Sequence, residues 1–298
     1  MNKSLVIMAA GMASRFGGNK QSTVVGPSGE VLADYAVYNA VRCGFKRVVF
    51  IIREEAVDIF DEITKKFKDR IEVCYAFQKL TDVPSDVVIP ETRVKMWGTT
   101  HALLAAEKFI DGPFLLINAD DFNDYEAFKY VNDFFESNTN ENDYISVNYE
   151  FGATKSKTGE AVKRAVAMLD GKKILDLMES SIGEEDGKLI ARSLNTDAVL
   201  EVDETTPVSV NFFGLKPSVF KYLHEDFDEF IHGELTDTCE CLLPFTLKAK
   251  IKDGTINMYQ EVAKSPWFGL TYKEDLPDVQ NRINKMIEEG KYPNNLWG

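Results

Sequence analysis

The sequence has 298 residues, of which 44% are hydrophobic and 28% are charged. This composition allows enough burial to offset the entropy of ordering the chain, so it excludes an intrinsically disordered protein. The formal net charge of -14 opposes general attraction to nucleic acid or anionic lipid, because that attraction relies on Lys and Arg neutralising phosphates. A phosphate-bearing ligand must then be met by local positive groups or by a metal ion.

The N-terminus passes directly into the apolar run at residues 5–8, which is shorter than a signal-peptide core and far shorter than a membrane span. We therefore expect a cytoplasmic protein with neither a membrane nor a nucleic-acid partner. Cys43, Cys74, Cys239 and Cys241 lack metal-ligand spacing, and we interpret them as reduced thiols.

Short β-branched runs alternate with helical patterns through the first half of the chain. The runs at residues 5–8, 48–52, 71–77 and 114–117 predict buried strands. Phe60, Ile63 and Phe67 recur at helical spacing, and residues 101–109 are rich in Ala and Leu. Repeated strand-helix-strand units predict a parallel sheet with right-handed crossovers.

The second half has a less regular pattern. Strands are predicted at residues 144–149, 161–168 and 209–213, helices at 217–231 and 274–289, and an exposed hairpin or loop at 180–189. We expect antiparallel additions to the parallel sheet here. The aromatic-rich tail at 292–297 would cover either its own core or a neighbouring subunit of a homo-oligomer.

A segment of small residues, Met-Ala-Ala-Gly-Met-Ala-Ser-Arg-Phe-Gly-Gly-Asn-Lys-Gln, follows the first strand at positions 8–21. Small side chains expose backbone amides to phosphate oxygens, and Arg15 and Lys20 add positive charge. Gly-x-Gly-x-x-Gly is absent, and the Walker arrangement requires Lys followed directly by Ser or Thr. The segment therefore predicts a different kind of phosphate loop.

This loop resembles the signature of the sugar-phosphate nucleotidyltransferases, roughly Leu-Ala-Ala-Gly-x-Gly-Ser-Arg-Phe-Gly-x-x-Lys, with Ala13 in place of the second glycine. The resemblance implies an α/β fold of three layers, GT-A-like, in which helices flank a Rossmann-like mixed, mostly parallel sheet. It also implies a single domain over residues 1–298, with a nucleotide-binding half at 1–125 and an acceptor-binding half with the C-terminal helix at 126–298.

The implied reaction joins the NMP part of an NTP to a small phosphorylated acceptor and releases pyrophosphate. The acceptor would be a sugar 1-phosphate or another phosphomonoester, such as choline phosphate. Lys20 would contact the α-phosphate and the acceptor phosphate, and Arg15 the leaving pyrophosphate. The nucleotide-binding loop would comprise Ala9, Ala10, Gly11, Met12 and Ala13.

Asp120 and Asp121 follow the fourth predicted strand, at the edge where open α/β sheets bind ligands. Their hard oxygen ligands suit Mg²⁺. The resemblance places Asp120 on the metal and the nucleotide, while Asp121 alone is equally interpretable as a helix N-cap or a residue of a solvated turn. Gly269 stands where the family commonly has its second metal ligand. Either Asp275 or Glu274 would replace that ligand, or water would complete the metal shell.

Gln78 and the segment containing Gly98 and Thr99 resemble the family's surroundings of the nucleobase. The 18 residues that separate Gln78 from Trp97 are more than the family usually has, and the choice among pyrimidine NTPs stays open. We interpret His101, on the next helix, as a structural hydrogen-bonding residue in preference to a proton carrier.

Four downstream residues, Arg164, Glu179, Asn211 and Glu240, have family counterparts that hydrogen-bond sugar hydroxyls. Taken singly, each is as well interpreted as an ordinary polar residue. Two alternative functions remain: a GT-A glycosyltransferase that uses a sugar nucleotide, and a non-catalytic nucleotide-binding protein. The Arg15 and Lys20 pair argues against the first, and the Ala13 and Gly269 departures motivate the second.

Overall fold

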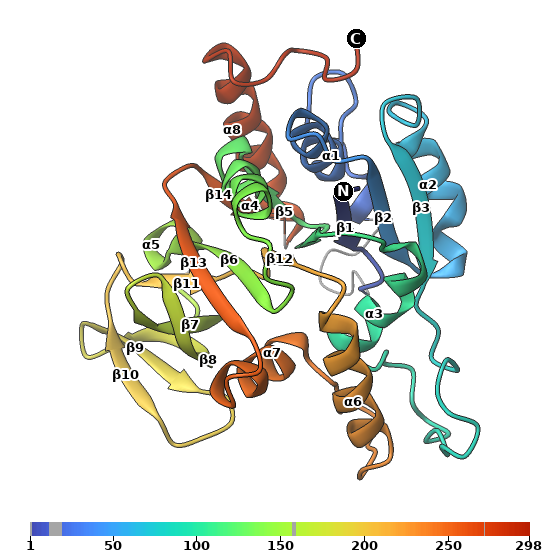
Figure 1. Ribbon diagram of the computed structural model, residues 1–298. Helices are drawn as coiled ribbons and strands as arrows, with labels where there is room; N and C mark the ends of the chain where they lie inside the picture. Colours follow the sequence, from blue (N-terminus) through green and yellow to red (C-terminus); the bar gives the residue numbers. More distant parts are fainter. Residues whose placement is uncertain (1, 12–19, 157–158, 271) are drawn as a thin grey trace.

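The computed structural model describes residues 2–11, 20–156, 159–270 and 272–298 (Figure 1). Its central strand, β1 (Ser4–Met8), lies between β2 (Arg47–Ile52) and β4 (Phe114–Asn118) and pairs in parallel with both. β3 (Glu72–Phe77) extends the parallel arrangement beside β2. The four strands predicted in the first half are therefore confirmed, with bounds that differ by one residue at most ends.

The sheet continues into the second half of the chain. Across the described ranges it holds twelve strands in the order β10-β9-β8-β7-β11-β6-β12-β4-β1-β2-β3, with β13 paired to β6 and β8. The further strands are β6 (Asp143–Glu150), β7 (Val162–Asp170), β8 (Lys173–Glu185), β9 (Lys188–Ser193), β10 (Val199–Val202), β11 (Pro207–Ser209), β12 (Phe213–Leu215) and β13 (Asn257–Ala263). β5 (Asp121–Asn123) and β14 (Trp267–Gly269) form a separate antiparallel pair.

The sheet is mixed, as predicted. Four pairings are parallel: β1 with β2, β1 with β4, β2 with β3, and β6 with β13. The other pairings in the described part of the sheet are antiparallel. The antiparallel share is larger than a mostly parallel sheet implies, because the hairpin strands β7 to β10 extend one edge.

Helices cover both faces, which gives the three layers expected (Figure 1). α1, α2 and α4 pack against the face of β1 that carries Leu5 and Ile7, and α3, α6 and α7 against the face that carries Val6. The helices are α1 (Leu32–Arg42), α2 (Val57–Thr64), α3 (Thr99–Ala106), α4 (Tyr125–Ser137), α5 (Phe151–Thr154), α6 (Val219–Ile231), α7 (Leu243–Lys252) and α8 (Leu276–Glu288), with 3-10 turns η1 (Lys20–Ser22), η2 (Glu54–Ala56), η3 (Glu107–Phe109) and η4 (Lys273–Asp275).

Two predictions in the second half need correction. The strand expected at 209–213 is wrong: β11 ends at Ser209, β12 begins at Phe213, and Asn211 between them has a φ of 63°, which a strand does not allow. Residues 180–189 do form a hairpin, but Ser180 and Ile182 are buried in β8, and only its tip at residues 184–188 is exposed.

The C-terminal tail packs on its own chain. Trp297 lies against the rings of Tyr38 and Phe67, and its Nε1 donates to the buried carboxylate of Asp34 at 3.0 Å. Tyr292 likewise donates to Asp124 at 2.8 Å. The tail therefore caps its own core. The four cysteines are free thiols, and none of the helices within the described ranges has the length and apolarity that a membrane crossing requires.

Candidate active site

The carboxyl ends of the parallel strands meet at one rim of the sheet. Lys20, in η1, places its Nζ 2.5 Å from Oδ2 of Asp120, the second residue after β4. The carbonyl of Asp120 accepts a hydrogen bond from the amide of Leu270 at 2.9 Å. Residues about a hundred positions apart in the sequence are thus held together, with the Lys20 side chain nearly buried and that of Asp120 partly exposed.

The predicted phosphate loop begins directly after β1. The Ala9 amide donates to the Ile51 carbonyl at 2.8 Å, so its one donor serves the sheet and is not available to a phosphate. The Ala10 carbonyl accepts from Nε of Arg53 at 3.1 Å, and Gly11 is exposed with open space around it. Met12, Ala13 and Arg15 lie outside the described residues, and their roles stay predictions.

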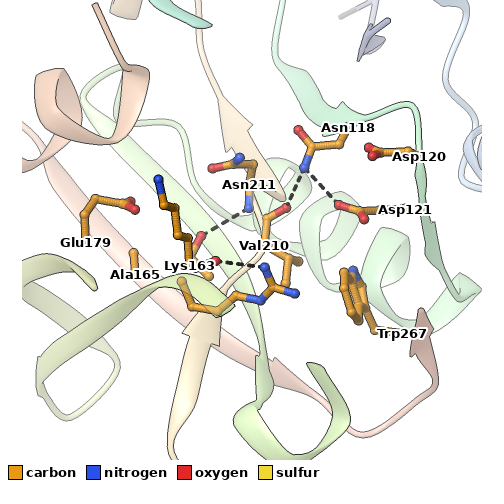
Figure 2. Close-up of a pocket in the computed structure, with 11 residues that line it drawn as sticks. Asn118, Asp120, Asp121, Lys163, Ala165, Glu179, Val210, Asn211 and Trp267 are labelled. Carbon is orange, nitrogen blue, oxygen red and sulfur yellow. Dashed lines mark hydrogen bonds between the residues drawn. The ribbon is translucent and has the colours of Figure 1, made fainter. Parts of the chain in front are cut away.

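A pocket of about 190 Å³ opens beside this rim (Figure 2). It brings together five of the predicted residues: Asp120 and Asp121 after β4, Arg164 on β7, Glu179 on β8 and Asn211 before β12. The complete lining is Asn118, Asp120, Asp121, Lys163, Arg164, Ala165, Glu179, Ser209, Val210, Asn211 and Trp267. Polar side chains from several strands therefore face one small space.

Asp121 is one of the two carboxylates after β4 that line this pocket. Its Oδ2 accepts from the Asn118 amide at 2.9 Å, and Asn118 also donates to the Val210 carbonyl at 3.3 Å (Figure 2). Burial and the neighbouring Asp120 carboxylate raise the pKa of Asp121 to about 7, against the effects of Asn118, Arg164 and Lys20. The helix N-cap alternative is wrong for Asp121, because Asp124 caps α4.

Arg164 is held by backbone carbonyls. Its guanidinium donates to the Lys163 carbonyl at 2.8 Å and the Thr154 carbonyl at 3.1 Å, and it lies 5.0 Å from the centre of the Trp267 ring. Burial lowers the pKa of Arg164, while Asp121, Asp120 and Glu179 oppose this. The cation is thus positioned in advance between two acidic regions of the pocket.

Glu179 lies at the other end of the pocket from Asp120, and its carboxylate points into the space between them (Figure 2). Burial raises its pKa, and the nearby Lys248 and Arg164 oppose that rise. Asn211 adopts its left-handed conformation beside this pocket, and its backbone N–H donates to Ser209 Oγ at 3.3 Å. Such backbone conformations are often retained where a side chain must be aimed at a ligand.

Glu240 does not join the pocket. Its carboxylate pairs with Lys95 at 2.6 Å, within the loop that separates Gln78 from Trp97. The same region fixes Thr99, whose Oγ1 accepts from the Leu243 amide at 2.9 Å. Gly98 has a φ of 102°, and a Cβ there would lie 2.4 Å from the Cys241 carbonyl oxygen, so this position requires glycine.

The segment at residues 267–269 lies beside the two carboxylates. In the β5–β14 pair Gly269 is the direct partner of Asp121. Asp275 instead accepts from the Tyr272 amide at 2.7 Å and caps η4, while Glu274 is exposed. Among the residues that the structure describes, no group of three or more His, Cys, Asp or Glu side chains has metal-binding geometry. The second metal ligand therefore stays open.

Solved structures resemble this chain over nearly its whole length. An inositol-1-phosphate CTP transferase from T. maritima is 13% identical, with a TM-score of 0.63 and coverage of 96% of this chain and 97% of that one. A putative glucose-1-phosphate thymidylyltransferase from Bacillus anthracis is 16% identical, with a TM-score of 0.65 and coverage of 94% and 95%. A UDP-glucose pyrophosphorylase complexed with UDP-glucose is 19% identical, with a TM-score of 0.63 and coverage of 96% and 99%.

The chain has the fold of the sugar-phosphate nucleotidyltransferases. The comparison confirms, at the level of the fold, the resemblance that the phosphate loop indicated. No family model and no curated protein matches the sequence. At these identities the likeness establishes the architecture, and the chemistry must be argued from the residues.

The nucleotidyltransferase fold also brings in residues that the sequence did not single out. Asn118 and Trp267 line the pocket, and Arg53 contacts the phosphate loop. Arg53 follows β2 directly, just as Gln78 follows β3. Its position at the end of a parallel strand could therefore have indicated that it lies at the rim. Trp267 gave none, because a buried aromatic residue near a strand is usually core.

Proposed function

We propose that the chain is a magnesium-dependent nucleotidyltransferase, which transfers the NMP group of an NTP to a sugar 1-phosphate or similar phosphomonoester and releases pyrophosphate. One observation carries the proposal: Lys20 contacts Asp120 at the mouth of a polar pocket that contains Arg164 and Glu179. A cation, a carboxylate suited to a metal ion and a site of monosaccharide size therefore share one rim.

The names of the structural neighbours support this class of acceptor. Inositol-1-phosphate and glucose-1-phosphate are phosphomonoesters of polyhydroxylated rings, and UDP-glucose is the product type expected of such a reaction. We propose that Arg164, Glu179 and Asn211 bind the polar groups of the acceptor. Glu240 pairs with Lys95 outside the pocket and is not part of this proposal.

The residues at the rim fit a divalent ion. Asp120 and Asp121 are adjacent carboxylates, and the charge of one raises the pKa of the other, a repulsion that a bound cation would relieve. Mg²⁺ keeps several waters, so two protein carboxylates suffice to hold it beside substrate phosphates. When bound, the ion would neutralise phosphate charge and orient the reacting groups.

The chain's own residues then have distinct tasks in the reaction. An oxygen of the acceptor phosphate attacks the α-phosphorus in line, that P–O bond forms as the bond to the pyrophosphate oxygen breaks, and no protein nucleophile is required. Lys20 would stabilise charge on the α-phosphate and acceptor phosphate, and Arg15 the departing pyrophosphate. Holding two mutually repelling anions in reacting geometry supplies the rest of the rate increase.

The direct test is a matrix of the four NTPs against a panel of sugar 1-phosphates and choline phosphate, with detection of pyrophosphate. Acceptor-dependent pyrophosphate release is expected for at least one combination. Consumption of a sugar nucleotide without pyrophosphate would instead indicate a glycosyltransferase. NTP binding without turnover throughout the panel would favour the non-catalytic alternative, which the glycine at position 269 motivates.

We further propose that residues 1–298 act as a single domain, because β12 joins the two halves through pairing with both β4 and β6. A cytoplasmic location fits the need for NTPs. The net charge of -14 supports function without nucleic acid.

A further inference from the structure

We propose that His101, oriented by the carbonyl of Asp82, holds the Gln78 side-chain amide in one orientation, so that Gln78 offers a hydrogen-bond acceptor to the nucleobase. The inference rests on the proposed function in one respect: the chain must bind an NTP with the nucleobase beside Gln78. It assigns a positioning role to His101 and gives a task to the unusually long loop at residues 79–96.

The Gln78 amide contacts two groups on the neighbouring helix start. Its Nε2 lies 3.1 Å from the Gly98 carbonyl oxygen and 3.4 Å from Nδ1 of His101. The side chain is only 6% exposed, and the backbone amide of Gln78 is fixed to the Ile52 carbonyl at 3.0 Å. Gln78 therefore stands at the end of β3 with little freedom to move.

The Gly98 contact fixes which end of the amide faces inward. A carbonyl oxygen can only accept hydrogen bonds, and that of Gly98 also accepts from the Ala102 amide at 3.1 Å. Rotating the Gln78 amide by half a turn would place Oε1 against the Gly98 oxygen. Two acceptors would then meet in a buried position, which is unfavourable.

The state of His101 fixes the same orientation independently. Its Nε2 lies 2.9 Å from the Asp82 carbonyl oxygen, which can only accept, so Nε2 carries the ring proton. His101 is 4% exposed and stacks on Phe227 with ring centres 4.8 Å apart, and burial lowers its pKa. In the neutral ring Nδ1 is then an acceptor, and it requires a donor from Gln78.

Both hydrogens of Gln78 Nε2 are thereby directed into the protein. Oε1 is left, and none of the described residues donates a hydrogen bond to it. A nucleobase bound there must present a donor, either a ring N–H or an exocyclic amino group. Asp82 belongs to the loop at 79–96, so this loop takes part in base selection through one backbone carbonyl.

The test compares binding of each of the four NTPs and of inorganic triphosphate by calorimetry. The variants are His101→Phe, which keeps the stacking but removes both ring nitrogens, and His101→Asn, whose amide can place an acceptor near the position of Nδ1. Glu91→Ala is the matched control, because Glu91 is an exposed carboxylate in the same loop. Thermal unfolding of each variant verifies folding.

We expect His101→Phe to weaken binding of the preferred NTP about tenfold, the scale of one lost hydrogen bond, and to reduce discrimination among the bases. Triphosphate binding should not change, His101→Asn should retain most of the discrimination, and Glu91→Ala should behave as wild type. Unchanged discrimination in a folded His101→Phe, or an equal loss for triphosphate, would overturn the inference. A wild-type protein that binds NTP without turnover would refute the proposed reaction alone, and the base-selection test would still apply.

Discussion

The adjacent carboxylates at the rim predict a pH-dependent cost of folding in the metal-free protein. Asp121→Asn removes one charge while keeping the shape of the side chain and an oxygen that can accept from Asn118. Burial and the Asp120 charge raise the pKa of Asp121 from 3.8 to about 7. The folded protein therefore holds this proton up to a higher pH than the unfolded chain does.

The sign and size of the effect follow from proton linkage. Below pH 3.8 both states are protonated, and Asp121 has no effect on the pH dependence of stability. As the pH rises from 3.8 to about 7, the free energy of unfolding falls, and it levels off above about 7. The total loss of stability is then at most about 4 kcal/mol, at ~1.4 kcal/mol per pKa unit. The free energy gained by Asp121→Asn should grow by about 3 kcal/mol between about pH 5 and about pH 8.5.

Urea unfolding at these two pH values, with a chelator present, measures the difference. Asp69→Asn is the control, because Asp69 is an exposed carboxylate on the same half of the chain. If the free energy of unfolding of Asp121→Asn exceeded that of wild type by the same amount at both pH values, the argument from crowded carboxylates would be refuted.

Three further predictions concern the rim and the start of α3. Lys20→Ala and Asp120→Ala should each lower turnover at least about a hundredfold without loss of folding, the usual scale for a lost electrostatic contact, whereas the exposed Lys172→Ala should retain wild-type rates. Added Mg²⁺ should raise the thermal midpoint of the wild-type protein but not that of a double Asp120→Asn, Asp121→Asn variant, and an equal rise in both would exclude these residues as ligands. Gly98→Ala should lower the free energy of unfolding by at least about 1–3 kcal/mol, because of its positive φ and the contact with a backbone carbonyl, and a stability unchanged in urea would contradict that account.

The sequence predicted the parallel half of the fold well because the strands there are continuous apolar runs, as in β2, whose residues 48–52 are all buried. Small residues after β1 and carboxylates after β4 then indicated one functional rim. The register of the sheet, which sets Met8 between Ile51 and Asn118, converts those separate strand ends into neighbours.

The pocket beside the rim could be predicted only in part. Arg164 and Glu179 lie 15 positions apart on paired strands, where Arg164 is opposite Ser180 and Glu179 is opposite Ala165. No local pattern in the sequence indicates this register. No sequence pattern indicated the left-handed conformation of Asn211, because the residues around it have strand-like composition. Glu240 and Lys95 form their ion pair across a long loop, a contact that no local pattern encodes.

The central claim is that the residues at this rim catalyse transfer of the NMP group of an NTP to a phosphorylated acceptor. Parallel reactions with an NTP labelled with ³²P at the α-position or at the γ-position, together with the best acceptor, test it most directly. The α-label should appear in the new sugar nucleotide and the γ-label in pyrophosphate. Transfer of the γ-label to the acceptor, or label leaving only as inorganic phosphate, would contradict the account.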